Sequence, residues 1–315
     1  MNSTPAPIPW KTEDILEATG GNLLAGSGAR VFQGIGIDSR NIAKEALFVA
    51  IIGDIHDGHT FVNSVLDKGV QGVLVQAEKA DELVPGDLAA KGITVVGVAD
   101  TTRALGDLAA FNRRRTLLKV IALTGSNGKT STRTMLTHIV ENKYATLATQ
   151  GNFNNEIGLP LTLLRLEKRH TLAVLELGMN RSGEIRRLAD ICKPDIGMIT
   201  NVAPAHLEGL GSIEAILRAK GELLEGLNTN GQTILNADDP LVASLAGNAP
   251  GEVLLFGRSD KAAIRAHHVN GKGLGVSFDL EVPGETARVT LATPGRFMIS
   301  NALAAAAAGY LLDIP

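Results

Sequence analysis

The stretch LLKVIALTGSNGKTSTRTML, residues 117–136, decides the fold of this chain. A continuous apolar run comes first, and a glycine-containing loop follows it. The loop leads into a helical pattern that places Met135, Leu136, Ile139 and Val140 on one side. Strand, glycine loop and helix in this order are typical of a nucleotide-binding phosphate loop. The sequence therefore predicts an α/β domain that binds a phosphorylated ligand.

The loop also predicts which atoms contact phosphate. Backbone N–H groups of residues 125–130 would surround phosphate oxygens at a helix N-terminus, where the helix dipole favours anions. Lys129 would reach the β- and γ-phosphates, and the Thr130 hydroxyl would bind Mg²⁺. The strict pattern requires glycine where Leu123 stands, so the shorter G-x-x-G-K-T remains; a turn with a solvated lysine is the alternative. The predicted nucleotide-binding residues are Gly125, Ser126, Asn127, Gly128, Lys129, Thr130 and Ser131.

The rest of the chain indicates two α/β domains. Apolar strands such as TLAVLELG, DIGMITNV and EVLLFG alternate with helical patterns, which indicates a parallel sheet covered on both faces. Residues 262–293 alternate apolar and polar positions between Gly and Pro turns, as a small antiparallel sheet does. We predict a small N-terminal α/β domain at 1–99. A P-loop domain with a parallel sheet and a small antiparallel sheet would occupy 100–315.

Composition excludes several classes of protein. The chain has 315 residues with 44% hydrophobic, 20% charged and 3% aromatic content and a formal net charge of −3, which argues against nucleic acid as a partner. Cys192 is the single cysteine, so no intrachain disulfide forms. The N-terminus lacks the pattern of a signal peptide, and the apolar residues 301–315 are too short to span a bilayer. We expect a cytoplasmic protein.

Two further side chains are candidate metal ligands. Glu176 ends the strand TLAVLELG, and His206 follows the strand in DIGMITNV. In open α/β sheets, ligands lie beyond the carboxyl ends of the strands. Glu176 and His206 would therefore meet near the phosphate loop and bind Mg²⁺. A capping carboxylate and a hydrogen-bonded loop histidine are the alternatives.

A lysine interrupts the apolar side of the predicted helix GSIEAILRAKGELLEGL, residues 211–227. Lys220 falls on the stripe formed by Ile213, Ile216, Leu217, Leu224 and Leu227. The opposite side carries Glu214, Arg218, Glu222 and Glu225. In one interpretation the ammonium of Lys220 reaches water along the edge of the stripe. In the other, burial lowers the pKa of the amine, which adds carbon dioxide and becomes a carbamate ligand for a metal ion.

Seven stretches together resemble the Mur ligase family, the ATP-dependent amino-acid ligases of peptidoglycan assembly. They are TGSNGKTS, GNFNNEIGLPLTLL, LELGMNRSGEI, NVAPAHLEGLGS, AKGE, LNADDP and NALAAA. Within the family, DSRNIAKEALFVAIIGDIHDGHTF and the ELGMN…GEI run most resemble the member that joins D-alanyl-D-alanine to UDP-MurNAc-tripeptide. The resemblance implies that ATP phosphorylates the tripeptide carboxylate and that the amine of D-alanyl-D-alanine attacks the acyl phosphate.

The resemblance also implies residue roles. Lys129, Lys220 and His206 are the implied catalytic residues. Thr130, Glu176, His206 and carbamylated Lys220 would hold two Mg²⁺ ions. Ser39 and Arg40 would lie near the uridine diphosphate. The muramoyl part would contact Asn152, Asn154 and Asn155, unless these asparagines form a turn that satisfies its own backbone.

The end of the chain departs from the family pattern in two ways. Asn301 stands at the position near adenine, but Phe297 and Met298 replace the usual polar residues before it. Asn236 and Asp238 in LNADDP would line the nucleotide site or form a turn before Pro240. The resemblance would place a Rossmann-type third domain after Pro315, and the chain is expected to be either a fragment or a divergent gene product. We expect this chain to be a monomer, to bind UDP-substrate and, weakly, ATP, and to ligate poorly or not at all.

Other functions remain open at this point. The member of the same family that adds the third residue of the peptide (the third-residue ligase) is the closest competitor. The first domain, which contains the DSR motif, argues against a folate polyglutamate ligase. A binding module without catalysis is a second class of function. A P-loop switch NTPase is a third class, which the lack of a second GTP-type motif disfavours.

Overall fold

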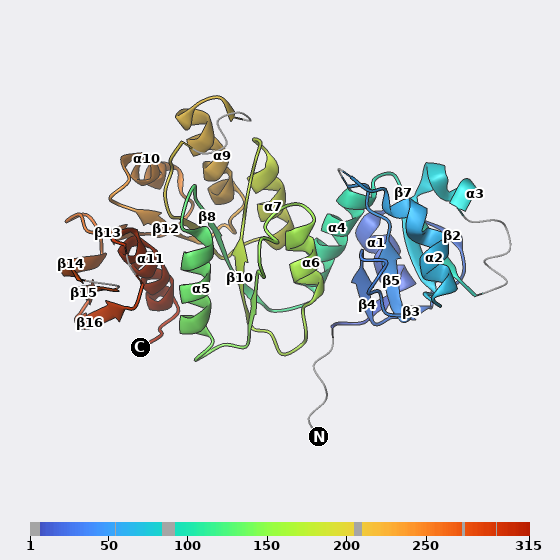
Figure 1. The fold of residues 1–315 in the computed structure, drawn as a ribbon, viewed down its shortest axis with the longest axis horizontal. Coiled ribbons are helices and arrows are strands. Elements are labelled where there is room, and N and C mark those ends of the chain that lie inside the picture. The colour runs from blue at the N-terminus through green and yellow to red at the C-terminus, as the bar shows by residue number, and fades with distance from the viewer. Residues whose placement is uncertain (1–6, 54, 84–91, 205–209, 273–274, 294) are drawn as a thin grey trace, which may run out of the picture. The chain divides into compact units, whose positions relative to one another are not determined.

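The computed structural model describes residues 7–53, 55–83, 92–204, 210–272, 275–293 and 295–315. Its contacts divide the chain into two compact units (Figure 1). The first unit contains residues 1–116 and 156–169, and the second contains 117–155 and 170–315. Helix α4 (Thr101–Arg114) belongs to the first unit because it packs against α1 (Thr12–Thr19) and α6 (Gly158–Leu164). The predicted boundary at residue 100 would place this helix in the second unit.

The first unit is built on a five-stranded sheet with the order β2-β7-β6-β5-β4. Its strands are β2 (Asn22–Ala25), β4 (Gly34–Gly36), β5 (Ala46–Val49), β6 (Gly72–Gln76) and β7 (Thr94–Val98). All neighbours are parallel except β2 and β7. Further helices are η1 (Gly58–Phe61), α2 (Val62–Asp67), η2 (Ala77–Lys79) and α3 (Ala80–Leu83). The predicted α/β class of this region is confirmed.

A two-stranded ribbon completes the first unit. Strand β1 (Trp10–Lys11) pairs with β3 (Val31–Phe32), which places Trp10 opposite Phe32. Trp10 is fully buried, and the Arg115 guanidinium lies 4.9 Å from the centroid of its ring. Burial of the indole against other side chains ties the ribbon to α4, which carries Phe111 at a ring distance of 5.7 Å.

The second unit contains a nine-stranded sheet with the order β16-β15-β14-β13-β12-β11-β8-β10-β9. The parallel strands are β8 (Lys119–Thr124), β9 (Thr146–Ala148), β10 (Leu172–Glu176), β11 (Ile196–Ile199), β12 (Gln232–Asn236) and β13 (Val253–Gly257). Strand β14 (Ile264–Lys272) continues the parallel order, and β15 (Gly275–Val282) and β16 (Glu285–Leu291) run antiparallel. The predicted parallel sheet is confirmed, and the antiparallel strands extend that same sheet.

Helices cover both faces of this sheet. On one face, α5 (Lys129–Val140) and α11 (Phe297–Leu311) pack together over strand residues such as Ile121 and Leu123. Helices α7 (Glu184–Cys192) and α9 (Ile213–Glu225) pack together and contact β8 on the other face, because successive strand residues point to opposite sides. The short α10 (Pro240–Ser244) and η3 (Leu245–Asn248) follow β12. Among the described residues, no helix has both the length and the apolar character needed to span a membrane.

The close contact between β6 and the ribbon generates a stability prediction. A Cβ added at Gly72 would lie 2.2 Å from a ring carbon of Phe32, whereas a Cβ at Gly34 would meet nothing within 4 Å. We expect Gly72→Ala to lower the free energy of unfolding by about 1–3 kcal/mol, because the ring has no room to move. Denaturant unfolding followed by Trp10 fluorescence measures this loss. The control Gly34→Ala should change stability by less than about 0.5 kcal/mol, and equal effects of the two variants would contradict the account.

Candidate nucleotide-binding and catalytic site

The phosphate loop connects β8 to α5 and depends on two glycines. Gly128 precedes α5 with φ of +78°, a conformation that favours glycine. A Cβ on Gly128 would lie 2.3 Å from Oδ1 of Asn301, and one on Gly125 would lie 2.0 Å from Oγ1 of Thr200. Both positions therefore require glycine, in agreement with the predicted loop.

Other polar atoms of the loop form hydrogen bonds within the protein. The N–H of Ser126 donates to the Asn201 carbonyl (3.0 Å), and the N–H of Asn127 donates to Oδ1 of Asn201 (2.8 Å). Oγ of Ser126 also accepts from the N–H of Ala203 (2.9 Å). These two N–H groups therefore do not point at a phosphate in this conformation. The first turn of α5, residues 129–131, retains N–H groups that a helix cannot pair with its own carbonyls.

Lys129 lies partly buried at the start of α5. Its Nζ donates to the carbonyl oxygen of Gly125 at 2.8 Å. Burial lowers the pKa of Lys129, and the carboxylate of Glu176 opposes that shift. The lysine is thus held inside the loop rather than extended into water, which argues against the alternative of a solvated turn.

Glu176 ends β10 beside the loop and is 2% exposed. Nδ2 of Asn154 donates to its Oε1 at 2.9 Å, and Oγ1 of Thr130 donates to its Oε2 at 3.1 Å. Nη1 of Arg133 lies 3.7 Å from the same Oε2 and donates to the Gly151 carbonyl at 3.0 Å. The structure therefore brings the predicted residues Thr130, Asn154 and Glu176 together. Arg133 was missed, although its place one turn after Thr130 was a usable signal.

Lys220 projects from α9 and is 2% exposed. Burial lowers the pKa of Lys220 to about 7, and the positive charge of Lys129 acts in the same direction. The interpretation in which the ammonium reaches water does not fit this burial. Two amines from α5 and α9 therefore lie close enough to repel each other at the phosphate loop.

Glu222, which was predicted on the side of α9 opposite the apolar stripe, is buried on that side. Its side chain is 6% exposed. It accepts hydrogen bonds from Oγ of Ser182 (2.9 Å), the N–H of Gly183 (2.8 Å) and the N–H of Arg186 (3.1 Å). Helix α9 is covered on this side by α7, which a single helical periodicity does not reveal.

The remaining predicted residues occupy separate places. His206 lies outside the described residues. In the first unit, Nε and Nη2 of Arg40 donate to Asp38 at 2.9 and 3.0 Å, and these bonds lower the Asp38 pKa to about 2. The carbonyl of Ser39 accepts from Nζ of Lys68 at 2.8 Å. Arg40 itself is exposed.

Within the second unit, asparagines hold turns. Asn152 and Asn155 are exposed in the loop that carries Asn154. Asn301 is buried and lies against Gly128, at the phosphate loop. Nδ2 of Asn236 donates to the Thr200 carbonyl at 2.8 Å.

Asp238 holds another turn, since its carboxylate accepts from the N–H groups of Arg258 (2.8 Å) and Ser259 (2.8 Å). Asn236 and Asp238 therefore bind the backbone of distant segments, and locally Oδ1 of Asn236 accepts from the N–H of Asp238 (2.9 Å).

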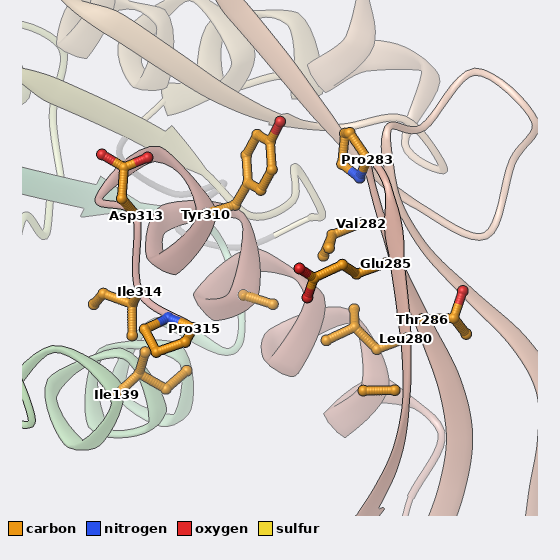
Figure 2. A pocket seen from close by; sticks show the side chains of 12 residues that line it. Ile139, Leu280, Val282, Pro283, Glu285, Thr286, Tyr310, Asp313, Ile314 and Pro315 are labelled. Carbon is orange, nitrogen blue, oxygen red and sulfur yellow. The ribbon is translucent and has the colours of Figure 1, made fainter.

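Two further observations concern metal-binding clusters and cavities. Among the described residues, no group of three or more His, Cys, Asp and Glu side chains could hold a metal ion. A cavity of about 470 Å³ opens between α11 and the antiparallel strands, where it is lined by Ile139, Leu280, Val282, Tyr310 and Ile314 among others (Figure 2). It contains none of the predicted site residues and is mostly apolar.

Comparison with known proteins gives matches over nearly the whole chain. The Mur ligase middle domain matches residues 123–309, and the Mur ligase family catalytic domain matches residues 31–113. Structures of MurF from Acinetobacter baumannii (TM-score 0.90, 33% identity) and of MurF from Thermotoga maritima in complex with ADP (TM-score 0.80, 26% identity) are similar. These two matches cover 99% and 90% of this chain and 66% and 64% of the respective solved chains.

Curated relatives carry one shared name. The UDP-N-acetylmuramoyl-tripeptide–D-alanyl-D-alanine ligases of Haemophilus influenzae and Escherichia coli are 37% and 38% identical to this chain. The matches cover 87% and 86% of this chain. The chain spans 58% of the length of each of these two relatives. The matching domain models, together with the glycine loop and its surrounding residues, show that the chain belongs to the Mur ligase family.

Proposed function

We propose that this chain forms the UDP-substrate-binding and ATP-binding parts of a ligase that joins D-alanyl-D-alanine to UDP-MurNAc-tripeptide. One observation carries the proposal: at the N-terminus of α5, the partly buried amine of Lys129 acts on the buried amine of Lys220 and helps to lower its pKa. Two cations withdrawn from water repel each other, and a polyphosphate between them would remove that repulsion. The names of the curated relatives supply the substrates.

The residues around the loop fit a nucleoside triphosphate. The first turn of α5 offers N–H groups and the positive end of the helix dipole. Lys129 would exchange its bond to the Gly125 carbonyl for phosphate oxygens, which requires movement of the side chain alone. Asn301 lies against the loop at Gly128 and would contact the nucleotide there.

Thr130 and Glu176 also fit Mg²⁺, because hydroxyl and carboxylate oxygens are the ligands that this ion prefers. The two are already 3.1 Å apart, and Asn154 and Arg133 hold the carboxylate in place. Lys220 would become an oxygen ligand as a carbamate, which requires the neutral amine that a pKa of about 7 provides. When bound, Mg²⁺ neutralises phosphate charge. A role for His206, action as a monomer and a cytoplasmic location are further parts of this proposal.

In the first unit, the turn of Asp38, Ser39 and Arg40 is proposed to hold the uridine diphosphate. Asp38 fixes the guanidinium through two bonds and leaves Arg40 exposed. An arginine fork suits diphosphate oxygens, because it can donate two parallel hydrogen bonds. Asn152, Asn154 and Asn155 are proposed to contact the muramoyl part, although Asn154 also serves Glu176.

Substrate choice tests the proposal directly. Calorimetry should show that the chain binds UDP-MurNAc-tripeptide at least about tenfold more tightly than UDP-MurNAc-dipeptide, since a missing residue leaves its contacts unmade. Arg40→Ala should weaken tripeptide binding about tenfold through lost charge-assisted bonds, whereas Arg169→Ala, an exposed arginine paired with Glu167, should not. Preference for the dipeptide would instead favour the third-residue ligase.

Removal of the loop lysine tests the nucleotide site. Lys129→Ala should weaken binding of Mg²⁺-ATP by about 10- to 100-fold, because a partly buried cation proposed to face the phosphates is lost. Titration calorimetry measures the change. Lys193→Ala is a matched control, since that lysine is exposed and paired with Asp190. Unchanged affinity in Lys129→Ala would contradict the phosphate-loop assignment.

The charge of Lys220 predicts a pH dependence of stability. Its pKa falls from 10.5 to about 7 on folding, so between these values the unfolded chain binds a proton that the folded chain lacks. The contribution of Lys220 to the free energy of unfolding therefore rises as the pH rises from 7 to 10.5. We expect Lys220→Met to have a higher free energy of unfolding than the original chain. The difference should be largest at pH 7 and should become smaller toward pH 10.

Urea unfolding in carbon-dioxide-free buffer at several pH values between these limits measures this difference. The exposed Lys193 provides the control variant Lys193→Met, whose difference from the original chain should stay constant with pH. A constant difference for Lys220→Met as well would show that the amine is not withdrawn from water.

A further inference from the structure

Glu222 is a buried acidic side chain of α9. The proposed roles of Lys220 and Glu176 do not explain why this carboxylate is buried. It lies two residues after Lys220, so the two side chains leave the helix on nearly opposite sides. Lys220 is 2% exposed on the side of α9 away from the contacts of Glu222. Glu222 is directed toward the first turn of α7.

The contacts of Glu222 form a cap on α7. The residue preceding that helix is Gly183, with φ of +89°, which has no side chain to accept from the first N–H groups. Oε1 of Glu222 accepts from the N–H of Gly183 and from Oγ of Ser182, and Oε2 accepts from the N–H of Arg186. A carboxylate from one helix thereby caps another, where the dipole also favours negative charge.

Other contacts also join the two helices. Arg186 and Glu225 already form an ion pair between α7 and α9. Ala189 and Gly226 are in such close contact that a Cβ on Gly226 would lie 2.4 Å from Cβ of Ala189. Withdrawing a carboxylate from water has a desolvation cost that an apolar side chain avoids. Directional bonds to three donors do, however, fix the position of α9 along and around its axis.

We propose that Glu222 is a positioning residue that sets the place of Lys220 relative to the phosphate loop and Glu176. The inference rests on the proposed function, because it assigns Glu222 to the same site. Strand β10 carries Glu176, and the chain then reaches α7 through residues 177–183. Glu222 thus anchors α9 to the segment that follows Glu176, while the buried Lys220 leaves the helix on the opposite side.

Glu222→Gln tests the proposal, and Glu225→Gln on the same helix is its control. Gln offers one acceptor oxygen and places an NH₂ group against a donor, so the cap is broken. Two measurements report on Lys220. One is its carbamate signal in ¹³C NMR with labelled bicarbonate, and the other is its acylation rate by acetic anhydride in carbon-dioxide-free buffer, mapped by mass spectrometry.

We expect Glu222→Gln to lower the carbamate signal and to raise Lys220 acylation, each about tenfold, as for lost bonds to a charged group. Both variants should remain folded at the assay temperature by circular dichroism. Glu225→Gln should change each readout by less than about twofold, as expected for an exposed ion pair. If Glu222→Gln matched Glu225→Gln in both readouts, the positioning role would be refuted.

Should Glu222→Gln fail to fold, Ser182→Ala removes one of the three donors and keeps the carboxylate. It should change both readouts about two- to fivefold, in line with the loss of one bond to a charged group, and no change would overturn the inference. Absence of a carbamate signal in the original chain would contradict the proposed function of Lys220. The acylation rates would still decide the role of Glu222.

Discussion

A buried amine and a partly buried amine near one phosphate loop form the constraint around which the second unit is arranged. Lys220 is buried on α9, and Lys129 is partly buried at the start of α5. Repulsion between two such cations favours either loss of a proton or the arrival of negative charge. Glu176 provides one nearby carboxylate, and its oxygens already accept from Thr130 and Asn154. The site is therefore suited to a ligand with several negative charges.

Glycines and long-range hydrogen bonds fix the shape of the phosphate loop. Gly125 and Gly128 let the loop approach Thr200 and Asn301 more closely than any side chain would allow. Segments far apart in sequence, such as Ser126 with residues 201–203, close the loop by hydrogen bonds. A loop fixed in this way presents the backbone at the start of α5 in place, as electrostatic binding of phosphate requires.

The fold and the outline of the site were predictable because they depend on local pattern. Apolar strands followed by helices predicted the parallel sheet, and Lys220 was recognisable as a cation on an apolar stripe. Asn154 was assigned to substrate, yet it contacts Glu176, because the loop containing it crosses the end of β10. Arg133 was overlooked for a similar reason, since its partners Glu176 and Gly151 lie 43 and 18 positions away in sequence.

By itself, the sequence determined the order of strands and helices, the glycine loop and the unusual lysine, because each is encoded by neighbours in the chain. Tertiary structure alone decided that Lys220 is buried within range of the charge of Lys129 and that Glu222 contacts the first turn of α7. Helical periodicity identifies one apolar face, but α9 is enclosed on two sides, so a polar position became a buried one. Packing of helices distant in sequence, rather than the pattern of any one helix, set the charges of this site.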